Sequence, residues 1–331
     1  MSKDHGTSDE IGAEIEFHID MRTRDLIAQG MPPEEARAEA VRRFGNVEAV
    51  RGAIVGARRA PLWSVVVLAT LGVCVIMQRI LSYFTFYREL YKAFPFYVPE
   101  SLKNGLEVAV CVAALLALGE RHLSRGLFLD RRVVRGLLFA VACTLPMFAG
   151  FVMTRHSDVR DLPALFYLAF FSPFVEELVT RGFAFGTLRR LGWPLWPAVA
   201  VCAMVTGLAH IEKGQNATQI LGLFVLPGIG GALFCWLLDR WGSLWFPWAL
   251  HAMMNFWWEV FNVAPTALGG WFAFVLQNGS VLLAILITFK FTRSMNGPRV
   301  AVTPGGSDAN ERGERTDPAS SRQAISLATL V

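Results

Sequence analysis

Long apolar runs dominate the chain after residue 60. Eight of these runs approach or exceed the roughly 20 residues that a helix needs to cross a bilayer. The pattern therefore predicts an all-α fold, a polytopic membrane helix bundle of about eight transmembrane helices within residues 61–293. The predicted spans cover residues 62–83, 103–119, 133–153, 162–187, 195–211, 217–238, 243–262 and 270–290.

The first 60 residues carry a different, amphipathic pattern. Apolar side chains recur at helical spacing from Ile11 to Leu26, and Gly30 ends that helix. The Pro-Pro-Glu-Glu segment at 32–35 suits the start of a second helix, which ends at Gly45. Residues 1–60 are therefore predicted to form a small N-terminal cytoplasmic helical hairpin. Binding to a cytoplasmic partner is one role open to this hairpin.

Composition supports the membrane interpretation and excludes other classes. Hydrophobic residues make up 53% of the chain and charged residues only 18%, whereas a soluble domain carries about 25% charged residues. The net charge of +4 is too small to indicate a nucleic-acid partner. The cysteines all lie inside apolar runs, which argues against a disulfide framework or a cysteine-based metal site; they are Cys74, Cys111, Cys143, Cys202 and Cys235.

The distribution of Lys and Arg predicts the orientation of the bundle. Most of these residues in the loops flank the ends that would share one side with the N-terminus. By the positive-inside rule, both termini are cytoplasmic. We therefore expect a multi-pass protein of the cell inner (plasma) membrane. Residues 294–331 are rich in Gly, Ser and charged residues and are predicted to be a disordered tail.

Ionisable residues inside the predicted spans are candidates for function, because lipid excludes them unless the protein interior accommodates them. Glu177 and Arg181 are four residues apart and share one helix face. Glu176 points about 100° away on the same helix, so a plain Glu177–Arg181 ion pair would leave it unexplained. His210 ends the fifth span, and His251 and Asn255 form another pair four residues apart on the seventh.

These groups are predicted to lie in one layer of the bilayer. At 1.5 Å per residue, Glu176 and His210 both lie roughly 21 Å from the turn between their spans. His251 lies about 15 Å from its own turn, and Asn255 lies one helical turn further, near the same level. Separate helices would thus bring carboxylates, imidazoles and an amide together.

This set of groups has the chemistry needed to hydrolyse an amide. A carboxylate with an imidazole can take a proton from water, and a second imidazole with an amide can donate hydrogen bonds to an oxyanion. The same residues, Glu176, His210 and His251, could instead hold a zinc ion with an open position for water. The sequence leaves the metal-free and zinc mechanisms open.

The motifs Glu176-Glu177-x-x-x-Arg181, His210 and His251-x-x-x-Asn255 resemble those of the CPBP intramembrane proteases. That family includes the type 2 CAAX prenyl endopeptidases and relatives of lysostaphin resistance protein A, and the resemblance covers about residues 160–262. It implies that Glu176 is the general base and His210 its partner. It also implies that His251 and Asn255 stabilise the oxyanion, with Glu177 and Arg181 bracing the site.

Two further features accompany this resemblance. Thr206 stands where the family usually has Phe, four residues before His210, so we expect looser packing there. Residues 17–51 resemble the permease prefix domain found in some bacterial export permeases. The bilayer is one partner of the chain, and the resemblance implies a membrane-associated protein or peptide as substrate.

Two other functions remain as alternatives at this stage. The polar cluster could serve a non-catalytic immunity or scaffold protein that binds a partner. A proton-coupled transporter is a third hypothesis, because buried Glu and His can relay protons.

Overall fold

The structure is a computed structural model that describes residues 3–292 except 131, 156, 158, 160 and 267. The described residues contain helices and no strand, in agreement with the predicted all-α class. They fall into two compact units that meet in the sequence between Trp63 and Ser64. The predicted tail at 294–331 lies outside the described residues.

The N-terminal unit is built on two helices, α1 (Lys3–Ala28) and α2 (Pro33–Phe44). The chain turns between them at Gly30, whose φ of +94° is a conformation that favours glycine. A strip of buried apolar side chains joins the helices and consists of Ile11, Ile15, Ile19, Leu26, Ala36 and Ala40. On the exposed side, Arg37 of α2 forms ion pairs with Glu16 and Asp20 of α1. The cytoplasmic location of this unit stays a prediction.

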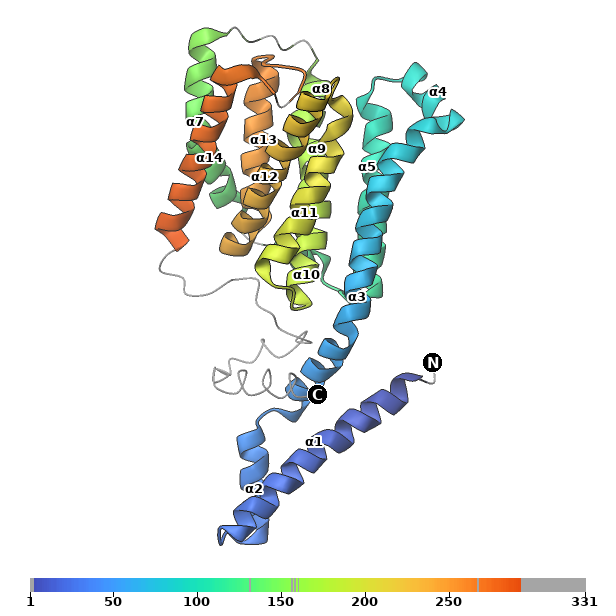
Figure 1. The fold of residues 1–331 in the computed structure, drawn as a ribbon, viewed down its shortest axis with the longest axis vertical. Coiled ribbons are helices and arrows are strands. Elements are labelled where there is room, and N and C mark those ends of the chain that lie inside the picture. Colours follow the sequence, from blue (N-terminus) through green and yellow to red (C-terminus); the bar gives the residue numbers. More distant parts are fainter. Residues whose placement is uncertain are drawn as a thin grey trace. The chain divides into compact units, whose positions relative to one another are not determined.

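The second unit is a helix bundle. Its first helix, α3 (Val47–Ile80), begins in the N-terminal unit, and its long members lie side by side in the bundle, as α7, α12, α13 and α14 show in Figure 1. The further elements are η1 (Leu81–Tyr83), α4 (Thr85–Ala93), α5 (Tyr97–Ala117), α6 (Leu123–Gly126), α7 (Val133–Thr154), α8 (Leu162–Phe166), η2 (Tyr167–Phe171), α9 (Ser172–Glu177), η3 (Leu178–Phe185), α10 (Gly186–Arg190), α11 (Leu195–His210), η4 (Ile211–Lys213), α12 (Ala217–Trp241), α13 (Trp245–Val260) and α14 (Gly270–Thr292).

Six helices of the described part of the chain are long and apolar enough to cross a membrane, so the predicted number of eight is not confirmed. Of the two others, α13 has only 16 residues, fewer than the roughly 20 that a full crossing needs. The helix α5 is long enough but carries Glu100, Lys103 and Glu107. The six helices cover Arg58–Tyr83, Val133–Thr154, Leu162–Arg190, Leu195–Lys213, Ala217–Trp241 and Gly270–Thr292.

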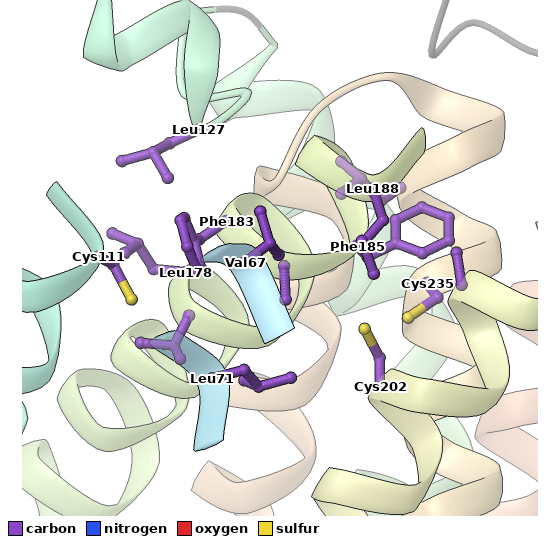
Figure 2. Close-up of a cluster of buried hydrophobic side chains, with 14 of the residues drawn as sticks. Val67, Leu71, Cys111, Leu127, Leu178, Phe183, Phe185, Leu188, Cys202 and Cys235 are labelled. Atoms are coloured by element: carbon purple, nitrogen blue, oxygen red, sulfur yellow. The ribbon is translucent and has the colours of Figure 1, made fainter. Parts of the chain in front are cut away.

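The segment from α9 to α10 runs through the interior of the bundle. Every residue of η3 is buried. Apolar side chains from α3, α5, α11 and α12 pack around this segment, as Figure 2 shows for Val67, Leu71, Cys111, Cys202 and Cys235. A second apolar cluster joins α7, α13 and α14. The charged residues of α9 and η3 therefore lie among apolar side chains.

Glycine allows α11 and α12 to pack closely beside this segment. A Cβ atom at Gly207 of α11 would lie 2.5 Å from the backbone oxygen of Phe224 on α12. A Cβ atom at Gly228 would lie 3.2 Å from the backbone oxygen of Ala203. Because backbone atoms cannot move aside as side-chain ends can, a larger residue at Gly207 must push the two helices apart.

This close approach predicts that Gly207→Ala lowers the free energy of unfolding by about 1–3 kcal/mol, the usual cost of overpacking. Thermal unfolding of the purified protein in lipid nanodiscs measures the change. Gly230→Ala is the matched control, because its Cβ would meet nothing within 4 Å and alanine favours the helix by about 0.5–1 kcal/mol. Equal unfolding temperatures for both variants would contradict the packing argument.

Candidate active site

Two π-helical segments, η2 and η3, flank the short helix α9 that carries Glu176 and Glu177. A π-helix brings residues five apart onto one face, whereas an α-helix brings residues four apart together. Arg181 in η3 accordingly contacts both acids. Its Nε lies 3.3 Å from Glu177 Oε2, and its Nη1 donates to Glu176 Oε1 at 3.4 Å.

This geometry corrects the expectation that Glu176 points away from Arg181. That expectation assumed a regular α-helix through residues 176–181, in which only Glu177 and Arg181 share a face. The wider turn of η3 changes the angular offset, so Arg181 reaches Glu176 as well as Glu177. Both carboxylates therefore share one cation.

The guanidinium of Arg181 is completely buried and is surrounded by acceptors. Beyond the two acids, Nη1 donates to Thr180 Oγ1 at 2.5 Å and Nη2 donates to Thr206 Oγ1 at 3.1 Å. The guanidinium carbon also lies 5.5 Å from the ring centre of Phe234, within the range of a cation–π interaction. A Cβ atom at Gly231 would come within 2.9 Å of Nη2, so glycine leaves the space that this guanidinium needs.

Glu177 orients His251. Its Oε1 lies 2.9 Å from His251 Nδ1, and because a carboxylate accepts hydrogen bonds, Nδ1 is the donor. The imidazole stacks on Phe234 with ring centres 5.2 Å apart. Glu177 is completely buried and its two oxygens face His251 and Arg181. Nε2 of His251 is the ring nitrogen left for other partners.

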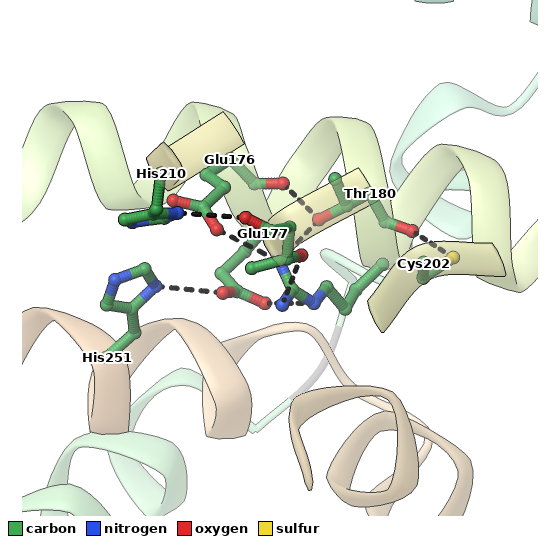
Figure 3. Close-up of polar contacts among 8 residues, drawn as sticks. Glu176, Glu177, Thr180, Cys202, His210 and His251 are labelled. Atoms are coloured by element: carbon green, nitrogen blue, oxygen red, sulfur yellow. Dashed lines mark hydrogen bonds and ion pairs between the residues drawn. The ribbon is translucent and has the colours of Figure 1, made fainter. Parts of the chain in front are cut away.

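His210 is oriented in a similar way from α11. Its Nδ1 lies 2.9 Å from the backbone oxygen of Thr206; a carbonyl can only accept, so Nδ1 again donates and Nε2 remains. Figure 3 shows the His210 ring beside the carboxylate of Glu176, with His251 on the same side of the two acids. Glu176 interacts electrostatically with both imidazoles and with Arg181. The predicted meeting of Glu176, His210 and His251 thus occurs in the structure.

Exposure separates the two acids. The side chain of Glu176 is 27% exposed, whereas those of Glu177 and Arg181 are 0% exposed. Only Glu176 of the three can meet a water molecule or a substrate from outside the bundle. This difference agrees with a reactive role for Glu176 and a bracing role for Glu177 and Arg181.

Asn255 lies one helical turn beyond His251 on α13. Its Nδ2 donates to the backbone oxygen of Leu168 in η2, at 3.3 Å. The structure therefore brings Asn255 to the neighbouring π-helical segment, and one of its two N–H groups remains for another acceptor. Its role at an oxyanion stays a prediction.

A candidate metal-binding group in the described part of the chain differs from the predicted one. Ligand atoms of Glu176, Glu177 and His251 all lie within 4.8 Å of one another, and His210 is not a member of this group. Glu177 Oε1 and His251 Nδ1 share a hydrogen bond, so these two atoms are occupied by each other. The group shares Glu176 and His251 with the predicted set, and a metal role stays a prediction.

Sequence reasoning missed the supporting residues. Thr180 donates to the backbone oxygen of Glu176 at 2.5 Å and accepts from Arg181. Thr206, which is buried, accepts from Arg181 through its hydroxyl and from His210 through its backbone oxygen. Thr206 therefore connects Arg181 to His210. The sequence predicted only looser packing at Thr206 and did not predict this connection. Thr206 lies four residues before His210, and this spacing places the two residues on one helix face.

Comparison with known proteins identifies the segment that carries this site. The family model of the type II CAAX prenyl endopeptidase Rce1-like proteins matches residues 158–257. No curated protein and no solved structure matches the chain. The match contains all six predicted site residues and confirms the resemblance inferred from their motifs. The helices α3 and α5 lie outside it.

The position of Thr206 predicts that Thr206→Val destabilises the protein more than Thr206→Ser. Valine removes the acceptor for a buried guanidinium, and a hydrogen bond to a charged group contributes about 1.5–3 kcal/mol. Serine keeps the hydroxyl and serves as the control. Thermal unfolding in nanodiscs measures both variants. If valine and serine unfold at the same temperature, Thr206 does not support Arg181 as described.

Proposed function

We propose that this multi-pass membrane protein, whose residues 158–257 belong to the type II CAAX prenyl endopeptidase Rce1-like family, hydrolyses a peptide bond of a membrane-associated protein or peptide. The observation that carries the proposal is the partly exposed carboxylate of Glu176, held between two oriented imidazoles and a buried guanidinium. The family match does not favour the predicted alternative of a non-catalytic immunity or scaffold protein.

Glu176 is the general base of this proposal. It takes a proton from a water molecule while the water oxygen attacks the carbonyl carbon of the scissile bond. His210 assists through Nε2, because its Nδ1 is occupied by the backbone oxygen of Thr206. Arg181 keeps Glu176 ionised before the reaction, since the opposite charge favours the carboxylate form.

His251 and Asn255 stabilise the oxyanion. The buried carboxylate of Glu177 favours the imidazolium form of His251. Because Nδ1 donates to Glu177, the Nε2–H group of this form is free to donate to another acceptor. Asn255 offers the N–H that Leu168 leaves unused. Donors fixed in place before the reaction lower the barrier because they need no rearrangement when the charge appears.

The charges of this arrangement balance without a metal. Glu176 and Glu177 carry two negative charges, and Arg181 and protonated His251 carry two positive ones. A divalent cation would add charge that the described residues of the site do not compensate, and it would compete with Arg181 for both acids. We therefore propose a glutamate mechanism over the zinc mechanism that uses Glu176, His210 and His251.

Glu176→Gln is expected to reduce the rate of cleavage by about 10²–10⁴-fold, the range attributed to general acid–base catalysis. The probes are a farnesylated CAAX peptide and a peptide with one transmembrane segment, each incorporated with the protein into phosphatidylethanolamine and phosphatidylglycerol vesicles. Glu259→Gln replaces a half-buried acid of α13 and should cleave as the wild type does. Wild-type rates for Glu176→Gln would overturn the assignment.

Metal analysis separates the two mechanisms. We expect the purified protein to cleave the probe at an unchanged rate after dialysis against a chelator, because no step of the glutamate mechanism uses a metal ion. Elemental analysis of the same sample gives the zinc content. Stoichiometric zinc, together with activity lost to the chelator and restored by zinc, would favour the zinc mechanism instead.

A further inference from the structure

Arg79, near the end of α3, contacts the chain on both sides of His210. Its Nη2 donates to the backbone oxygen of Leu208, two residues before His210, at 2.9 Å. Its Nη1 forms an ion pair with Glu212, two residues after His210. Arg79 belongs to the same compact unit as the site but lies outside the segment that the family model matches. One side chain of α3 therefore holds the backbone before and after an imidazole of the proposed site.

The end of α11 needs partners from outside the helix. The last four carbonyl groups of an α-helix have no α-helical N–H partner, and α11 ends at His210. The backbone oxygen of Leu208 is one of these four. The short turn η4 follows directly. Because helix ends open more readily than helix interiors, the backbone of His210 depends on contacts from other elements.

A guanidinium suits this position for two reasons. Its planar fork of N–H groups can donate in two directions at once, here to Leu208 and to Glu212. A cation beside the last turn also interacts favourably with the negative end of the helix dipole. Lysine keeps the charge but lacks the fork, so it replaces only part of this interaction.

The position of the His210 ring depends on this backbone. Nδ1 of His210 donates to the backbone oxygen of Thr206, which sets the rotation of the ring. The ring extends from the last turn of α11 to lie beside Glu176, as Figure 3 shows. A displacement of about 1 Å at a reacting group can lower a rate by about 10²-fold. Thr206 therefore orients the ring, whereas Arg79 holds the helix end that carries it.

We propose that Arg79 is a positioning residue that keeps His210 beside Glu176, an assignment that rests on the proposed peptidase function. In this role Arg79 contacts neither the attacking water nor the peptide and acts only through the end of α11. The six predicted site residues all lie within residues 158–257. Arg79 thus adds a contribution from α3, a helix that the family match does not include.

The first test observes His210 without any substrate. Solid-state nitrogen NMR spectra of histidine-labelled protein in nanodiscs report each imidazole, and the His210 signals are assigned by their loss in His210→Ala. Arg79→Ala should shift or broaden these signals and leave those of His251 in place. Arg155→Ala is the matched control, because Arg155 also donates to a backbone oxygen beyond a helix end, that of Asn262, at 3.3 Å. Unchanged His210 signals in Arg79→Ala overturn the inference.

The second test uses the vesicle assay with the two peptides. Arg79→Ala should lower kcat by about 10–10²-fold with little change in KM, because it displaces a reacting group and removes no contact to the peptide. Glu212→Gln should stay within about fivefold of the wild type, since an exposed ion pair contributes little and the bond to Leu208 remains. Arg155→Ala should match the wild type. An Arg79→Ala protein that unfolds at the wild-type temperature and keeps the wild-type kcat overturns the inference.

A double-mutant cycle shows whether Arg79 acts through His210. His210→Ala alone should lower kcat by about 10²–10⁴-fold. Adding Arg79→Ala should then cause no further loss, because the imidazole that it positions is already absent. A residue that only supported the bundle would lower the rate by the same factor in both backgrounds, so additive effects overturn the inference. Rates are measured with the protein in excess over the peptide, which makes slow variants comparable.

These tests separate the inference from the proposed function. If the wild type and Arg79→Ala cleave both peptides equally well, the peptidase proposal stands and the role of Arg79 is wrong. If the wild type cleaves neither peptide, the peptidase proposal is contradicted, and the NMR spectra still decide whether Arg79 holds His210. If Arg79→Ala does not fold, Arg79→Lys takes its place in every test, with effects in the same direction and of smaller size.

Discussion

The burial of one guanidinium group organises the site. Arg181 has no contact with solvent, so the acceptors for its N–H groups must come from the protein, and only Nε lacks a hydrogen bond and faces Glu177 Oε2 as an ion pair. The acceptors come from Glu176, Thr180 and Thr206, and Glu177 supplies a charge 3.3 Å away. Satisfying this cation therefore fixes α9, η3 and α11 relative to one another. The imidazoles follow, because Glu177 holds His251 and Thr206 holds His210.

The π-helical turn allows Arg181 to contact two consecutive acids of the same continuous helical segment. In a regular α-helix, consecutive acids diverge by about 100°, and a single arginine could serve only one of them. The wider turn of η3 lets Arg181 contact both Glu176 and Glu177. Such insertions weaken the backbone hydrogen-bond pattern and are frequent at functional sites. Glu176 is partly exposed while its neighbour Glu177 is fully buried, so two identical side chains lie in different surroundings.

The sequence predicts depth better than rotation. The rise per residue is nearly constant, so counting from turns predicts Glu176, His210 and His251 at one level, and Figure 3 shows their side chains near one another. The direction of each side chain depends on local helix type, which hydrophobic periodicity does not report, and this is why the contact between Arg181 and Glu176 was missed. The same limit applies to α5, whose polar residues were expected in a span but are buried by neighbouring helices. Packing partners decide such cases, and periodicity does not identify them.

Charge balance connects the core of the site to its surroundings. With His251 protonated, two acids and two cations cancel, and the buried cluster needs no counter-ion from outside. A neutral cluster can be enclosed in an apolar bundle, whereas a net charge would draw in water or an ion and loosen it.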